Sequence, residues 1–172
     1  MTNLYRNLTA RLEAVPGVLS ASASSHRLIT GWVSNGPARI PGAPGLDDGS
    51  LPVHYNHVGP RFFETMGIPV LLGRGPSAQD TRDAPQVAFV NESVAKRAFP
   101  DGSPLGAMVY LGGDEGYQIA GVVADAHYAG VKQDPPPTVY IPYEQNPWGI
   151  NNSLHFAVRT AVSPLSLIHI SE

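Results

Sequence analysis

Apolar positions near the start of the chain follow the period of a helix. Leu4, Leu8 and Leu12 recur at every fourth residue, which places them on one helical face. Pro16-Gly17 follows, and neither residue favours the continuation of a helix. The pattern therefore predicts a helix over residues 4–14, with the three leucines on its apolar side.

Short apolar runs later in the chain predict strands, because their residues alternate or cluster between turn signals. The runs lie at residues 18–24, 51–58, 68–72, 86–90, 108–111, 117–124, 138–143 and 154–159. Residues 30–50 are instead crowded with Gly, Pro, Asn and Asp, so we expect a long exposed loop without regular structure there.

Two more helices are expected to be short. Pro60 suits the first helical position of one of them, and Gly67 suits the residue that ends it. Asn91 can cap the other, which would run over residues 92–98. Brief helices among many short strands indicate an α+β fold.

The composition of the 172 residues excludes several kinds of chemistry. No cysteine is present, so disulfides, thiolate metal sites and a cysteine nucleophile are ruled out. The net charge of −3 is spread along the chain without a basic cluster, which argues against nucleic acid as a partner. No apolar run approaches the roughly 18 residues that span a bilayer.

Two pairs of residues invite a metal or hydrolytic hypothesis. His54 and His57 are three residues apart on a predicted strand, so their side chains point to opposite faces. Asp125 and His127 are two residues apart and would share a face, which is half of a metal site. A small secreted hydrolase or metal-binding protein that uses Asp125 and His127 is the alternative hypothesis for function.

Other candidate residues carry weaker indications. Ser24-Ser25-His26 brings a hydroxyl beside an imidazole, but sequence neighbours do not make a catalytic triad, and Gly-x-Ser-x-Gly is absent. Neither glycine-rich phosphate motif occurs, so no cofactor is expected. Trp32 lies in the predicted long loop and Trp148 in a predicted turn, where a tryptophan can anchor a partner protein or cover a corner of the core.

Six short motifs follow one another in the order known from one family. They are residues 58–69 (VGPRFFETMGIP), 72–74 (LGR), 87–100 (VAFVNESVAKRAFP), 104–106 (PLG), 119–125 (IAGVVAD) and 139–143 (VYIPY). In these motifs the chain resembles the MacB-like periplasmic core domain of bacterial ABC transporter permeases of the MacB/FtsX type. Val15-Pro16-Gly17-Val18 extends the resemblance toward the first predicted helix.

The resemblance implies a two-lobed α+β domain over residues 1–165. A β-rich lobe, about residues 59–136, would be inserted into a helix-and-strand lobe built from about residues 1–58 and 137–165. The second lobe would be similar to the porter modules of efflux pumps. The resemblance also implies a non-catalytic domain, with no catalytic, cofactor-binding or metal-binding residue and no enzyme activity.

The resemblance further implies a place on the periplasmic side of a bacterial inner membrane. There the domain would relay ATP-driven conformational change and contact periplasmic partners during export. Its partners would be an ABC ATPase subunit or domain elsewhere in the complex, a periplasmic or outer-membrane protein, and a second permease subunit in a dimer.

The two ends of the chain are expected to be those of a fragment. In the family this domain lies between a first transmembrane helix and three further ones, and neither flank is present. Residues 166–172 (SLIHISE) look like translated adapter sequence on a truncated metagenomic reading frame, so we expect a non-native tail. We therefore also expect the strands at residues 18–24 and 154–159 to lack neighbours and to have exposed edges.

Overall fold

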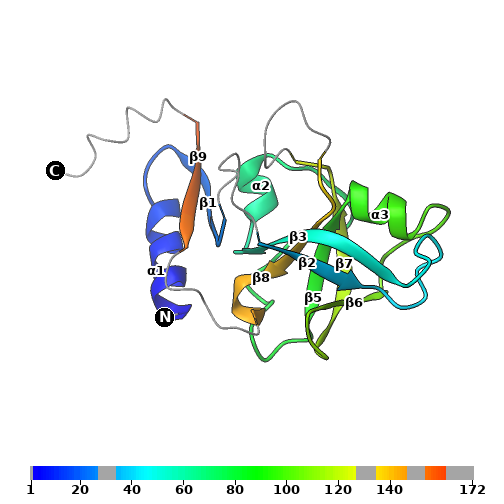
Figure 1. Cartoon of the computed structure of the whole chain (residues 1–172). Helices are drawn as coiled ribbons and strands as arrows, with labels where there is room; N and C mark the ends of the chain where they lie inside the picture. Colours follow the sequence, from blue (N-terminus) through cyan, green and yellow to red (C-terminus); the bar gives the residue numbers. More distant parts are fainter. Residues whose placement is uncertain (1, 27–33, 127–134, 147–153, 162–172) are drawn as a thin grey trace.

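The computed structural model describes residues 2–26, 34–126, 135–146 and 154–161 (Figure 1). Its helices are α1 (Thr2–Glu13), α2 (Phe62–Met66) and α3 (Glu92–Ala98), with a 3-10 helix, η1 (Tyr143–Gln145). Its strands are β1 (Val18–Ser24), β2 (Ser34–Arg39), β3 (Ser50–Val58), β4 (Val70–Gly73), β5 (Val87–Asn91), β6 (Met108–Leu111), β7 (Gly116–Val123), β8 (Thr138–Pro142) and β9 (His155–Thr160). No helix in these ranges has both the length and the apolar character needed to cross a membrane.

Six of the strands form a sheet that closes on itself. The order is β2-β6-β7-β5-β8-β3, and β3 pairs again with β2. β3 with β8 and β5 with β7 are parallel, whereas the other pairs in the ring are antiparallel. The closed sheet, on the right in Figure 1, is therefore mixed, and together with the short helices it confirms the predicted α+β class.

Apolar side chains gather on both faces of the closed sheet. Along β5, Ala88 and Val90 belong to one buried cluster, and Val87 and Phe89 belong to another. The first cluster draws residues from all six strands of the ring, so it fills the inside of the closed sheet. The second lies on the outer face, where α2 covers it with Phe62 and Phe63. Because both faces are covered, β5 and β8 are buried along their whole length.

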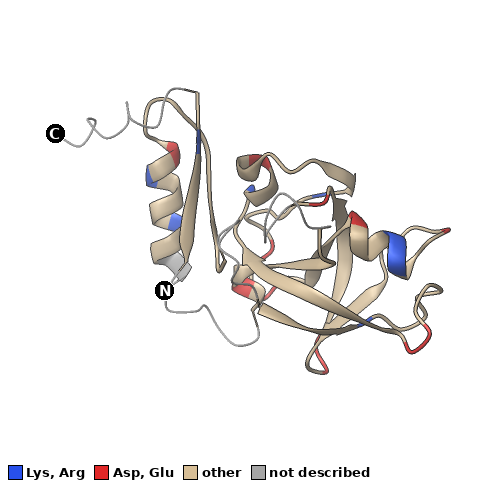
Figure 2. Ribbon diagram, turned by 45° about the horizontal axis from the view of Figure 1, so that its top comes forward, with Lys and Arg blue, Asp and Glu red and all other residues tan. Residues whose placement is uncertain are grey.

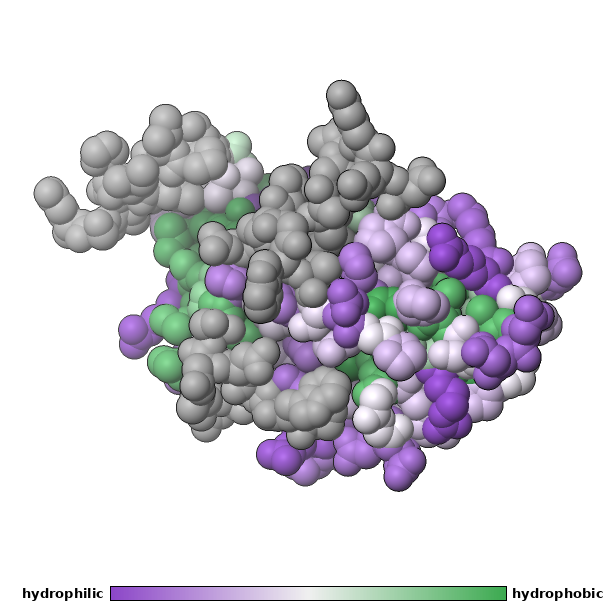
Figure 3. Space-filling view, in the orientation of Figure 1, coloured by the Kyte–Doolittle hydropathy of each residue, from purple (hydrophilic) through white to green (hydrophobic). Residues whose placement is uncertain are grey.

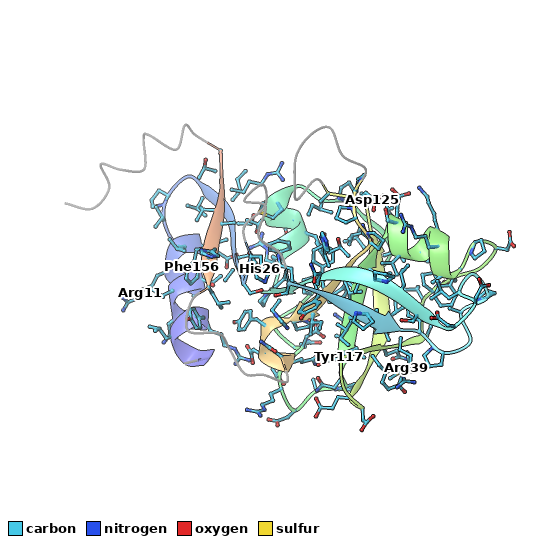
Figure 4. All side chains as sticks on the ribbon, viewed as in Figure 1. Arg11, His26, Arg39, Tyr117, Asp125 and Phe156 are labelled. Atoms are coloured by element: carbon cyan, nitrogen blue, oxygen red, sulfur yellow. The ribbon has the colours of Figure 1, made fainter. Side chains whose placement is uncertain are left out.

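α1, β1 and β9 form a second body beside the closed sheet, here called the flanking unit. β1 and β9 pair antiparallel along most of their length. α1 covers one face of this two-stranded ribbon, where the rings of Tyr5 and Phe156 have centroids 6.1 Å apart (Figure 4). α2 contacts the opposite face, so the ribbon lies between two helices (Figure 1).

The pairing of β1 with β9 changes the expectation for their edges. The prediction that the strands at residues 18–24 and 154–159 lack neighbours is wrong for the edge that they share. On its other edge, β1 has one bridge to the closed sheet, with Ser24 opposite Val58 of β3. β9 pairs with no other strand in the part of the chain that the structure describes.

The long loop expected at residues 30–50 contains a strand, because β2 lies within it. Pro37 of β2 faces Pro52 of β3. Every second pair in an antiparallel ladder exchanges no hydrogen bonds, and His54, two residues after Pro52, directs its N–H away from β2 to Pro137 O (2.8 Å). The facing prolines therefore occupy a pair that needs no N–H donor, and the strand forms despite them.

The predicted ends of the short helices are confirmed in two places. Gly67 ends α2 with left-handed backbone at φ 70°. Asn91 caps α3, because its side-chain oxygen accepts a hydrogen bond from Val94 N. Both devices depend only on near neighbours in the chain, which is why local patterns reveal them.

One other helix prediction is wrong, and a second is wrong at one residue. α2 begins at Phe62 and not at Pro60, because Arg61 has left-handed backbone (φ 57°, ψ 16°) and serves as the N-cap residue. In α1 the most buried apolar side chain is Tyr5, at 9% exposed, whereas Leu4 is 57% exposed. Leu8 and Leu12 are partly buried as expected, so only Leu4 departs from the predicted apolar face, and Tyr5 is buried in its place.

The division into two lobes stays a prediction, but strand pairing crosses its limits. β3 ends at Val58 and β8 begins at Thr138, both outside the lobe expected at residues 59–136. Both strands nevertheless belong to the closed sheet, where β8 lies between β3 and β5. Among the described residues, strand pairing sets only the flanking unit apart from the closed sheet, and this unit is smaller than the helix-and-strand lobe predicted from residues 1–58 and 137–165.

Candidate functional site

Asp125 lies two residues after the end of β7, and its side chain is hydrogen-bonded to the start of α3 (Figure 4). Ser93 N donates to Asp125 Oδ1 at 3.0 Å, and Ser93 Oγ donates to Oδ2 at 2.9 Å. His127, Trp32 and Trp148 lie outside the described residues. Among the residues that are described, no group of three or more acidic or histidine side chains is placed to hold a metal ion. The contacts of Asp125 are structural and do not favour the hydrolase or metal-binding alternative.

Ser24-Ser25-His26 anchors the end of β1 to β3. Ser25 Oγ donates to Asn56 Oδ1 at 3.0 Å, and Asn56 Nδ2 donates to His26 O at 3.1 Å. His57, in β3, is buried. Its burial, with a smaller repulsion from His26, lowers the pKa of His57 to about 4. Figure 4 shows His26 where the flanking unit meets the closed sheet. These groups join two strands and form no catalytic arrangement.

The flanking unit meets the closed sheet along a narrow seam. In the described ranges, two backbone hydrogen bonds cross it: Ser25 N donates to His57 O at 2.9 Å, and Gly59 N donates to Ala23 O at 2.7 Å. Both lie where β1 and β3 end, beside the single bridge between these strands. The two bodies therefore share one short line of backbone contact, and side chains make the remaining connections.

Arg61 spans the seam toward the start of β1. Its Nη1 donates to Glu13 Oε1 at the end of α1 (2.6 Å), and its Nη2 donates to Leu19 O (3.3 Å). The same guanidinium bonds both carboxylate oxygens of Glu64 in α2, at 3.0 and 2.7 Å. Arg61 is the one non-glycine residue with positive φ among those described. Such backbone costs about 1–2 kcal/mol.

A second ion pair joins α1 to η1. Arg6 Nε and Nη2 donate to Glu144 Oε1 and Oε2 at 2.7 and 2.6 Å, so both prongs of the guanidinium are used. Hydrogen bonding to Glu144 raises the pKa of Arg6. Because 44% of the Arg6 side chain is exposed, the pair contributes only about 0–1 kcal/mol. It sets the position of α1 without locking it.

Between these contacts the seam is closely packed around Gly59. A Cβ at Gly59 would lie 3.1 Å from Ser22 Oγ and 3.1 Å from Tyr143 Cε1, so a side chain there would crowd both. Ser20 and Ser22 are each 1% exposed, and their hydroxyls have no hydrogen-bond partner among the described residues. A buried hydroxyl without a partner costs roughly 1–3 kcal/mol. The seam is therefore less stable than an apolar contact of the same fit.

The flanking unit also exposes apolar side chains. Leu4, Leu19 and Val158 are 57, 54 and 39% exposed. In Figure 3 apolar residues gather on the side of the molecule where α1 and β9 lie. A gathering of exposed apolar side chains is typical of contact with another chain.

Sequence reasoning did not find the seam. Arg6 and Glu144 are 138 positions apart, and no local pattern links them. Gly59 and Arg61 stand out in the sequence only as part of a family motif. The one available signal was that this motif combines a glycine with a charged residue directly after a predicted strand.

A family model, the MacB-like periplasmic core domain, matches residues 3–165. The chain belongs to this family. The resemblance inferred from the ordered motifs is thereby confirmed. This member of the family is 29% identical over 137 residues to the macrolide export ATP-binding/permease protein MacB of Mannheimia succiniciproducens. The match covers 80% of this chain and 18% of that protein, so the chain spans less than a fifth of its relative.

Three solved structures share the fold of this MacB-like domain. The periplasmic region of MacB from Actinobacillus actinomycetemcomitans matches with a TM-score of 0.67 at 19% identity, over 94% of this chain and 68% of that one. The extracellular domain of the ABC-type transporter YknZ from Gram-positive bacteria matches with a TM-score of 0.61 at 19% identity, over 92% of this chain and 74% of that one. A domain of a permease protein from Porphyromonas gingivalis matches with a TM-score of 0.58 at 20% identity, over 92% of this chain and 69% of that one. At these identities the likeness shows the fold alone.

Proposed function

We propose that this chain is the extracytoplasmic part of an ABC transporter permease, and that it relays ATP-driven movement without catalysing a reaction itself. The observation that carries the proposal is the seam. The flanking unit joins the closed sheet by one strand bridge, the packing of α2 against the ribbon and a few polar side chains, whereas continuous strand pairing holds each body together. Such a joint allows a force on one body to change its position relative to the other.

Family membership supports a location on the periplasmic side of the inner membrane, because the matching model is that of a periplasmic domain. The name of the relative from Mannheimia succiniciproducens joins ATP binding to a permease, so we infer an ABC ATPase elsewhere in the complex. We propose a second permease subunit as a further partner. The exposed Leu4, Leu19 and Val158 support a contact of the flanking unit with a periplasmic or outer-membrane protein.

The proposal is tested by a distance across the seam in the full-length permease. Spin labels on Arg11→Cys in α1 and Asp101→Cys after α3 occupy exposed positions on the two bodies, and this chain has no cysteine of its own. Cysteines elsewhere in the permease are replaced first. We expect the distance distribution measured by pulsed electron paramagnetic resonance to shift when ATP and vanadate trap the transporter.

A matched pair of labels on the closed sheet serves as the control. Asp101→Cys and Gly113→Cys are both exposed and both belong to that body, so their distance should stay the same in every nucleotide state. An unchanged distance for the pair across the seam, in a permease that still hydrolyses ATP, would contradict the relay function.

A further inference from the structure

We propose that the flanking unit swings away from the closed sheet as one body, opening the seam between β1 and Gly59 while its own packing stays intact. This inference deepens the proposed function and rests on it for its purpose, because the swing supplies the relay with a moving part. Three features of the structure carry it: the two faces of β1, the hydroxyls buried in the seam, and the arrangement of the contacts that cross it.

The two faces of β1 are covered by different bodies. Side chains alternate along a strand, so Ser20 and Ser22 share one face, and Ala21 and Ala23 share the other. Ser22 Oγ lies 3.1 Å from the position that a Cβ of Gly59 would take, so the serine face looks into the seam. α1 lies on the far side of the ribbon in both Figure 1 and Figure 2, so the alanines face α1 within the flanking unit.

The buried hydroxyls favour opening on the serine face. Ser20 Oγ and Ser22 Oγ have no hydrogen-bond partner among the described residues, although each serine is only 1% exposed. When the seam opens, water can bond both hydroxyls, which lowers the free energy of the open state. The alanine face has no buried hydroxyl, so its packing against α1 gains nothing of this kind from water.

The contacts that cross the seam are a hinge, two latches and the packing of α2 against the ribbon, where Arg159 Nη1 donates to Glu64 O at 3.0 Å. The backbone bonds to His57 and from Gly59 lie close together at the end of β1, where they can act as the hinge. The ion pairs of Arg61 and Arg6 are the latches. Their arginine side chains are 43 and 44% exposed, so water can replace the carboxylate partners at small cost.

Single cysteines in the cysteine-free chain test the swing. Ser22→Cys reports on the seam, Ala21→Cys on the contact between β1 and α1, and Ala88→Cys on the inside of the closed sheet; all three residues are at most 1% exposed. The rate of reaction with the thiol reagent DTNB is measured without denaturant. We expect Ser22→Cys to react at least about ten-fold faster than Ala88→Cys, with Ala21→Cys as slow as Ala88→Cys. Adding Arg61→Ala should accelerate Ser22→Cys alone.

Two outcomes would overturn the proposal. Equal, fast rates for Ser22→Cys and Ala21→Cys would mean that β1 itself unfolds, and a rate for Ser22→Cys as slow as that of Ala88→Cys would mean that the seam stays closed. If Ser22→Cys does not fold, as judged by circular dichroism, Ser20→Cys reports on the same face. The labelling uses the 172-residue chain without nucleotide. An open seam together with an unchanged spin-label distance would therefore refute the relay function and leave the swing standing.

Discussion

Replacing Gly121 with alanine tests how closely β4 is packed onto β7. A Cβ at Gly121 would lie 2.0 Å from Arg74 O, with Arg74 C and N also within 3.2 Å. Gly73 is the register partner of Gly121, and a Cβ there would lie 2.3 Å from Ala120 O. These neighbours are backbone atoms, so no side-chain rotation can relieve the conflict.

The size of the destabilisation by Gly121→Ala follows from the backbone that must move. Ordinary contact begins at 3.4 Å, so the backbone around Arg74 has to retreat from a Cβ that would otherwise approach to 2.0 Å. This movement breaks the hydrogen bond from Arg74 N to Ala120 O (3.1 Å) and disturbs the pairing of Gly73 with Gly121. At about 1 kcal/mol for each of two or three bonds, we expect Gly121→Ala to lower the free energy of unfolding by about 2–3 kcal/mol.

The assay is urea unfolding followed by circular dichroism, with Gly113→Ala as the matched control. A Cβ at Gly113 meets nothing within 4 Å, so that variant should change the free energy of unfolding by no more than about 0.5 kcal/mol. A Gly121→Ala chain as stable as Gly113→Ala would refute the argument, because the close approach of β4 to β7 would then be absent in solution.

Three further predictions concern the core, one histidine and the alternative function. Phe63→Ala should lower the free energy of unfolding by about 3–5 kcal/mol, because Phe63 is only 1% exposed and packs against three aromatic rings. Leu19→Ala, at an exposed position, should change the free energy of unfolding little in the same urea titration. Folding lowers the pKa of His57 from 6.5 to about 4. The contribution of neutral His57 to the free energy of unfolding should therefore be complete above pH 6.5 and be lost as the pH falls toward 4. His57→Gln should weaken this pH dependence. Asp125→Ala should lower the free energy of unfolding by about 1–2 kcal/mol, because it removes the two hydrogen bonds from Ser93. Zn²⁺ should leave the melting temperature of the unmodified chain unchanged. A rise in melting temperature with Zn²⁺ that Asp125→Ala abolishes would favour the metal-binding alternative.

Local features of the fold could be predicted because they depend on near neighbours. The bounds of β1 and β6 equal those of the predicted runs, and Asn91 caps α3 as expected. β2 was missed because Gly36 and Pro37 disfavour a strand by themselves. It forms because β3 and β6 lie on its two sides and supply the pairing that its own residues do not specify.

The candidate site could not be predicted in the same way. The guanidinium of Arg61 gains its role from Glu13 and Leu19, which lie 48 and 42 positions away in the chain. Arg6 meets Glu144 only because η1 lies beside α1 in the folded molecule. An exposed arginine in a sequence has many carboxylates within reach in principle, and nothing in its local pattern selects one.

The sequence by itself determined the order and type of most elements, the family, and the exclusion of cysteine chemistry, because these follow from local period, ordered motifs and composition. The tertiary structure alone decided that β2 and β3 close the sheet, that β1 pairs with β9, and that Ser20 and Ser22 are buried without partners. Those outcomes depend on contacts between distant segments, whose free energy exists only once the whole chain has packed.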